Sequence, residues 1–204
     1  NSLISPVDVK KLSRSKQKVA TPFDFNNIKY DVIIGNPPYM KSEDMKTITP
    51  AEYPLYKTKY RTAYKQYDKY FLFIEKGLSI LNDKGYLGYI VPSKFTKVGA
   101  GKNLRELLSS SGYLKRIISF GANQIFKSKT TYTCLLILNK SRNEHCEYYE
   151  VRNLSEWKVR NVDNEDFEKN IMSSLDSDVW VLVPSYLRLI FPRKSGHNEE
   201  LVVE

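Results

Sequence analysis

Four consecutive residues, Asn36-Pro37-Pro38-Tyr39, bring together groups that can hold and activate an amine attached to an aromatic ring. Each proline removes a backbone donor and fixes φ, and the residue before each proline is pushed toward an extended conformation. The turn is therefore stiff, and its carbonyl groups face outward with no neighbouring N–H to pair with them. The Asn36 side-chain carbonyl and the Pro37 backbone carbonyl are two candidate acceptors, and Tyr39 offers a flat face on which a base can stack.

An exocyclic amine conjugated to a ring is a poor nucleophile because its lone pair is delocalised. Two acceptors on its two N–H bonds draw the nitrogen toward sp³ character, so that the lone pair points at an electrophile. A base in a duplex reaches such a turn only by flipping out, which costs a few kcal/mol. A plain Asn-Pro turn and a proline-rich peptide ligand are the alternative interpretations. The strand that precedes the turn favours a site.

The strand that must position this turn is Tyr30–Gly35, a short β-branched run closed by glycine. We expect it to be buried, with the turn beyond its carboxyl end, where ligands of open α/β sheets bind. Residues 1–20 are predicted to form a basic surface helix or a frayed end. Residues 40–57 are predicted to form a long polar loop broken by Pro50 and Pro54.

A stripe of apolar residues spaced alternately by four and three predicts a helix that ends at Asn82-Asp83-Lys84-Gly85 through a left-handed turn residue. The stripe consists of Tyr60, Tyr64, Tyr67, Phe71, Ile74, Leu78 and Leu81. We expect its three tyrosines to pack in the core and not to stack on bases. A strand at residues 86–91, a helix at residues 102–110 and strands at residues 114–120 and 131–138 follow.

This order of elements predicts an α/β fold with a partial Rossmann-like sheet of about four strands, mostly parallel. Only about ten residues join the last two strands, too few for a crossover helix, so an antiparallel hairpin is expected at the sheet edge. Beyond residue 145 the pattern weakens. Tyr148–Val151 can add a strand, residues 153–178 are acidic and irregular, and short apolar pieces at 180–183 and 186–191 precede a polar tail.

The composition limits the cellular setting and the partners. The 204 residues carry 32 basic and 23 acidic side chains, a formal net charge of +9, which suits a polyanionic partner. Lys41, Lys46, Lys57, Lys59 and Arg61 can follow a phosphate backbone or line a solvated loop. With neither a signal peptide nor a membrane-spanning run, a soluble cytoplasmic protein is expected. Cys134 is expected to be a reduced core residue, and neither a disulfide with Cys146 nor a metal site is predicted.

At these residues the sequence resembles the N6-adenine DNA methyltransferases of prokaryotic restriction–modification systems, most nearly the Taq-type and type IIG enzymes. The turn and its strand resemble the family's fourth motif. Asp68 and Tyr70 with residues 73–76 resemble the helix that follows, and residues 85–93 the next strand. Gly121–Phe126 and the strand at 131–138 resemble the family's hairpin motif, so the resemblance covers about residues 24–140.

The resemblance implies a role for each matching residue. Asn36 and Pro37 would bind the target amine, Tyr39 would stack on the adenine, and Phe126 would pack against the flipped base from another side. The residues implied to lie near S-adenosylmethionine are Pro38, Phe73, Asp24 and Phe25. For Phe73 a core role stays equally open, and the match of Asp24-Phe25 is loose.

The family's Gly-rich turn, which holds the methionine part of the cofactor, and the ribose-binding acidic residue have no counterpart here. We therefore expect residues 24–145 to be the target-base half of a methyltransferase domain, after a basic segment at residues 1–23. Residues 146–204 would connect to a target-recognition domain. The expected partners are double-stranded DNA and the rest of a longer polypeptide, namely its cofactor-binding half and the recognition domain. An endonuclease domain is a further open alternative. The chain alone is expected to be inactive.

Three other functions remain open. The same four residues occur in methyltransferases that act on the glutamine amide of release factors, and an RNA methyltransferase is a related possibility. A non-catalytic DNA-binding or assembly module that kept the fold belongs to a different class. The long loop expected at residues 40–57 and the hairpin aromatic Phe126 favour a base as substrate.

Overall fold

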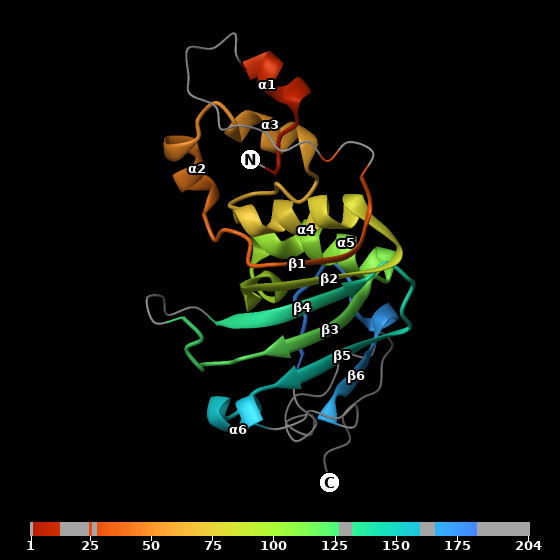
Figure 1. Ribbon diagram of the computed structural model, residues 1–204. Coiled ribbons are helices and arrows are strands. Elements are labelled where there is room, and N and C mark those ends of the chain that lie inside the picture. Colours follow the sequence, from red (N-terminus) through yellow and green to blue (C-terminus); the bar gives the residue numbers. More distant parts are fainter. Residues whose placement is uncertain (1, 13–24, 26–27, 127–131, 160–165, 183–204) are drawn as a thin grey trace, which may run out of the picture.

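A single twisted sheet organises the structure, a computed structural model that describes residues 2–12, 25, 28–126, 132–159 and 166–182 (Figure 1). Within these residues the sheet has six strands in the order β1-β2-β4-β3-β5-β6. The strands are β1 (Tyr30–Gly35), β2 (Leu81–Pro92), β3 (Leu114–Ser119), β4 (Thr133–Asn139), β5 (His145–Glu150) and β6 (Glu168–Ile171).

The sheet confirms the predicted fold class, with two corrections, of which the first is that it has six strands where about four were predicted. Strands β1 and β2 pair in parallel, as do β3 and β5, whereas β4 runs antiparallel to both β2 and β3 and β6 runs antiparallel to β5. Four strands thus share one direction, and β3 and β4 form the expected antiparallel hairpin. The hairpin is not at the sheet edge, because β4 lies between β2 and β3. Its buried Cys134, Leu136 and Leu138 suit that interior position.

Two helices cover one face of the sheet, α4 (Lys69–Ile80) and α5 (Lys102–Ser111). The apolar face of α4 buries Phe71, Ile74 and Leu78, and α5 buries Leu104 and Leu108 against the same core. The prediction for α5 is confirmed.

The predicted start and end of the first long helix were wrong. The helix begins at Lys69, so Tyr60, Tyr64 and Tyr67 precede it in a segment where Lys65 has a positive φ of 51°. Tyr60 and Tyr67 are nevertheless buried, which confirms packing for these two. The helix ends at Ile80, and the left-handed residue is Lys84 (φ 63°).

The predicted long loop at residues 40–57 was also wrong, because it contains helices α2 (Ser42–Ile48) and α3 (Tyr53–Lys59). Pro54 does not break α3, since it occupies the first turn, where its missing N–H would have no helical partner. With α1 (Pro6–Leu12), these helices gather on the side of α4 that faces away from the sheet (Figure 1). Leu3, Met45 and Tyr56 are fully buried in this outer layer.

The C-terminal part is more regular than its sequence indicates. The extra strand expected near Tyr148 is present as β5, but residues 153–178 also contain α6 (Leu154–Val159), β6 and a short 3₁₀ turn at Met172–Ser174. Helix α6 packs Trp157 against Phe120 on the second face of the sheet. Residues 183–191, the last apolar piece included, lie outside the described ranges. No helix in the described ranges is both long and apolar enough to cross a membrane.

Arg105 of α5 holds the connection between β2 and α5, which consists of 3₁₀ turns η1 (Ser93–Thr96) and η2 (Gly99–Gly101). Arg105 is 2% exposed, and its guanidinium donates hydrogen bonds to the carbonyls of Phe95 (2.6 Å), Val98 (2.9 Å) and Ser177 (3.1 Å). Burial lowers the pKa of Arg105, and Asp178 and Asp176 oppose that change. One buried cation therefore ties the segment after β2 to the C-terminal segment.

Replacing Gly101 with alanine should destabilise this connection. A Cβ there would lie 2.2 Å from the Phe95 carbonyl oxygen and 2.7 Å from Nη1 of Arg105, the two groups that form the shortest of these bonds. We expect Gly101→Ala to lower the free energy of unfolding by about 1–3 kcal/mol in denaturant titrations. Gly99→Ala is the matched control, because its Cβ would meet nothing within 4 Å. Equal stability of the two variants would contradict the packing described.

Candidate functional site

The Asn36–Tyr39 turn leaves the carboxyl end of β1 next to the carboxyl end of β2, since Gly35 pairs with Tyr89. Asn36 and Pro38 are exposed, whereas Pro37 is buried. Among the described residues nothing hydrogen-bonds to the Asn36 carboxamide. A stiff turn thus presents one free side-chain acceptor at the sheet edge where a ligand of an α/β fold would lie.

A hydrogen bond fixes Tyr39 to strand β2. Its hydroxyl donates a hydrogen bond to the Ile90 carbonyl of β2 at 2.9 Å, and its ring is half-buried. Burial, with a smaller contribution from Cys134, raises the pKa of Tyr39 to about 12, so the hydroxyl stays protonated and keeps donating at neutral pH. The hydrogen bond therefore sets the orientation of the ring relative to the turn.

Two further aromatic rings meet Tyr39 edge-on. Tyr70 of α4 is fully buried, donates its hydroxyl hydrogen bond to the Pro92 carbonyl at 3.0 Å, and has its ring centroid 6.1 Å from that of Tyr39. Phe126, which follows β3, is partly exposed with its ring centroid 6.4 Å from Tyr39 and its plane at 70°. The structure thus brings together Tyr39 and Phe126, which are far apart in the sequence and were predicted to share one site.

An ion pair between a half-exposed lysine and a buried carboxylate lies beside this cluster, and sequence reasoning missed it. Lys94 in η1 lies 2.6 Å from the carboxylate of Asp68. Asp68 is 5% exposed and occupies the N-cap position of α4, two residues before Tyr70. Burial raises the pKa of Asp68, and the Lys94 ammonium opposes that rise. The backbone of Asp68 also bridges to Lys41, two residues after Tyr39. The only available signal was the position of Lys94 just after the end of a predicted strand.

The residues proposed to bind the cofactor are not gathered in the same way. Phe73 packs partly buried against the main core. The ring of Phe25 contacts Tyr30 edge-on at 6.3 Å, at the opposite end of β1 from Asn36, with the Lys76 ammonium 5.7 Å from its centroid. Pro38 is exposed beside Asn36, and Asp24 lies outside the described residues. Cofactor roles for these four residues stay predictions.

Both cysteines are buried and free, which confirms Cys134 as a core residue. Burial raises the pKa of Cys134 to about 12, so its thiol stays protonated. In the described part of the chain no group of three or more His, Cys, Asp or Glu side chains is placed to hold a metal ion.

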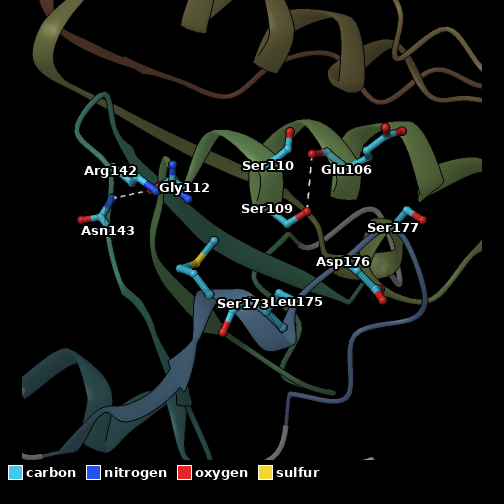
Figure 2. Close-up of a pocket in the computed structure, with 11 residues that line it drawn as sticks. Glu106, Ser109, Ser110, Gly112, Arg142, Asn143, Ser173, Leu175, Asp176 and Ser177 are labelled. Carbon is cyan, nitrogen blue, oxygen red and sulfur yellow. Dashed lines mark hydrogen bonds between the residues drawn. The ribbon is translucent and has the colours of Figure 1, made fainter. Parts of the chain in front are cut away.

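A groove of about 390 Å³ lies elsewhere, between α5 and the segment that follows β6 (Figure 2). Its lining residues are mostly hydroxyl-bearing and charged: Glu106, Ser109, Ser110, Gly112, Arg142, Asn143, Met172, Ser173, Leu175, Asp176 and Ser177. None of them belongs to the Asn36–Tyr39 turn or to its aromatic neighbours. The groove is therefore separate from the candidate site.

The second face of the sheet is uncovered over β1 and β2, contrary to the prediction of a buried first strand. Ile34 is 82% exposed, Val32 is 58% exposed, and Tyr86, which pairs with Val32, is 48% exposed. A Cβ on Gly88, the partner of Ile34, would meet nothing within 4 Å. These four residues, the open sheet face, form an apolar surface larger than isolated exposed side chains would make.

Comparison with known proteins identifies the family to which the sequence is similar. A family model described as Eco57I restriction-modification methylase matches residues 3–126. Over 196 residues the chain is 50% identical to the type II restriction enzyme and methyltransferase RM.Eco57I of Escherichia coli, covering 95% of the chain and 19% of that protein. It is 31% identical over 116 residues to the type II methyltransferase M.BstVI of Geobacillus stearothermophilus, covering 57% of the chain and 20% of that protein. The chain thus spans about a fifth of the length of these relatives.

Solved structures agree in fold. A cryo-EM structure of a DrdV–DNA complex matches 72% of the chain and 17% of its own chain with a TM-score of 0.53 at 19% identity. The methyltransferase subunit of a type I restriction-modification system from Streptococcus thermophilus matches 80% of the chain and 38% of its own chain with a TM-score of 0.50 at 18% identity.

Removing the Tyr39 hydroxyl should loosen the turn without removing its ring. We expect Tyr39→Phe to lower the free energy of unfolding by about 1 kcal/mol, the usual net value of one hydrogen bond. Tyr132→Phe removes a hydroxyl from a tyrosine that is 63% exposed and serves as the control in the same denaturant titration. If both variants were as stable as the parent, the Tyr39–Ile90 hydrogen bond would not be holding the turn.

Proposed function

Because the chain belongs to the Eco57I family of restriction-modification methylases, we propose that it carries the target-base side of a DNA methyltransferase site. The reaction proposed for the whole protein is transfer of a methyl group from S-adenosylmethionine to N6 of an adenine in DNA. The observation that carries the proposal is the Asn36 carboxamide, which has no hydrogen-bond partner among the described residues. It lies on a turn whose tyrosine is hydrogen-bonded to β2 and bordered by Phe126.

In this proposal the chain's own residues hold the amine and the ring. The Asn36 side-chain carbonyl and the Pro37 backbone carbonyl accept hydrogen bonds from the two N6 hydrogens, which turns the nitrogen lone pair outward. The flipped adenine stacks on the open side of Tyr39. Because Tyr39 and Phe126 already touch edge-on, the base does not lie between them, and Phe126 borders it from the side. The cofactor, when bound, supplies the electrophilic methyl carbon.

The residues present fit only a small part of a cofactor site, since Phe73 is packed in the core and Phe25 lies at the far end of β1. We propose that a cofactor-binding segment of a longer polypeptide covers the open sheet face and completes the site. Two findings support this occupant. The segment matched to this chain makes up only about a fifth of each of the two relatives. The run Val32-Ile33-Ile34 is also typical of a strand that is buried on both faces.

Replacement of Asn36 tests the acceptor role. We expect Asn36→Ala in the full-length protein to lower kcat for methyl transfer to DNA by at least about 100-fold, the scale of losing one transition-state hydrogen bond. DNA affinity should change little. Asn103→Ala is the control, because Asn103 is a surface asparagine that bonds the Arg61 carbonyl outside this site. Undiminished methylation by Asn36→Ala would contradict the proposed mechanism.

A charge on the open sheet face tests the proposed occupant. If a further segment covers β1, Ile34→Asp must bury a carboxylate and should lower the stability of the full-length protein by about 2 kcal/mol or more. Ile171→Asp in β6 is the control, because Ile171 is 47% exposed on another strand, and its effect should stay within about 0.5 kcal/mol. Thermal unfolding and S-adenosylmethionine affinity are the readouts. Unchanged values for Ile34→Asp would mean that this face stays in water.

A further inference from the structure

Two lysines of the outer helical layer point at one aromatic ring. The ammonium of Lys46 in α2 lies 5.5 Å from the centroid of the Tyr53 ring, and that of Lys57 in α3 lies 5.6 Å from the same centroid. The ring itself is held in place, since it stacks in parallel on buried Tyr67 with centroids 6.3 Å apart and planes at 6°. Both positive charges therefore lie beside one aromatic ring whose position is fixed by stacking.

The charges of these two lysines are not neutralised locally. Within the described ranges neither Lys46 nor Lys57 forms an ion pair, although Glu43 lies one turn before Lys46 in α2. Other basic residues of the same region are engaged: Lys59 pairs with Asp8, and Arg61 pairs with Glu106 at 3.5 Å. A cation over a ring gains orientation and modest energy but keeps its charge. Among the basic residues of this region, Lys46 and Lys57 are therefore held in a fixed orientation and are also available to an external anion.

Their position suits the DNA backbone. Helix α2 begins three residues after Tyr39 and leaves the sheet edge where β1 ends, and α3 lies beside it beyond α4 (Figure 1). A duplex that inserts a base at Asn36–Tyr39 must bring its flanking phosphates past the protein surface around that edge. Phosphate contacts of this kind fix the register of a protein on DNA without reading its sequence.

We propose that Lys46 and Lys57, oriented by Tyr53, bind the phosphate backbone of the DNA strand next to the flipped base. This inference rests on the proposed function, because it takes duplex DNA as the substrate. It adds a binding site on α2 and α3 whose role is to position the duplex, and it assigns no base specificity to either lysine.

The test compares the full-length protein with a variant carrying Lys46→Gln and Lys57→Gln. Binding of a duplex that contains the recognition sequence is measured at several salt concentrations. Losing two phosphate contacts should weaken binding roughly tenfold and reduce the slope of log affinity against log salt by about 2. The KM for DNA should rise in proportion, and kcat at saturating DNA should be unchanged. Lys115→Gln is the control of equal charge type, because Lys115 on β3 is paired with Glu147.

Each outcome decides the proposal. An unchanged dependence of DNA affinity on salt would overturn it. A fall in thermal stability with unchanged DNA affinity would also overturn it, because it would show that the lysines bind an acidic part of the protein itself. Failure of the proposed function is visible separately. In that case Asn36→Ala would still methylate DNA, or the parent protein would not methylate DNA at all, whatever the lysine variant does to binding.

Discussion

The hydrogen bond from the Tyr39 hydroxyl to the Ile90 carbonyl joins the turn after β1 to the end of β2. Without it the two prolines would stiffen the turn internally but would not fix its direction relative to the sheet. Around this bond the aromatic rings of Tyr70 in α4 and of Phe126 in the segment after β3 meet Tyr39. Tyr70 in turn bonds the Pro92 carbonyl, two residues beyond Ile90. The end of β2 thus serves as the common support for the candidate site.

The segment after β2 is itself held firmly. Lys94 pairs with buried Asp68 at the start of α4, and Arg105 binds the carbonyls of Phe95 and Val98. Gly101 is required beside Phe95, because any larger residue would displace that hydrogen bond. These contacts fix the end of β2, to which Tyr39 is hydrogen-bonded, relative to α4 and α5. A precise site at the edge of a sheet needs such rigid support, because small displacements weaken positioned hydrogen bonds.

Local sequence signals predicted the elements that build the site. The β-branched run of β1, the leucine spacing of α5 and the short link between β3 and β4 each have a direct physical cause in backbone geometry. The signals failed where tertiary structure decides. Tyr60 and Tyr67 follow helical spacing but are buried in a non-helical segment, and α2 and α3 were missed because short polar helices resemble loops. No local pattern could place β4 between β2 and β3, or pair Lys94 with Asp68.

The exposed side of β1 explains one wrong prediction and supports the proposed function. A strand with three consecutive β-branched residues is expected to be covered on both faces. In β1, however, Ile33 packs against the core while Val32 and Ile34 face solvent. A further segment of a longer polypeptide is the cover that we propose for these two side chains. The names of these relatives, all of restriction-modification proteins, give no support to a release-factor or RNA substrate.

Identification of the methylated nucleoside tests the central claim most directly. DNA treated with the full-length protein and S-adenosylmethionine would be digested to nucleosides and analysed by mass spectrometry. An amine-binding turn with a stacking tyrosine predicts N6-methyladenine as the product. Methylation on a cytosine carbon, or no DNA methylation by an active, folded protein, would contradict the account.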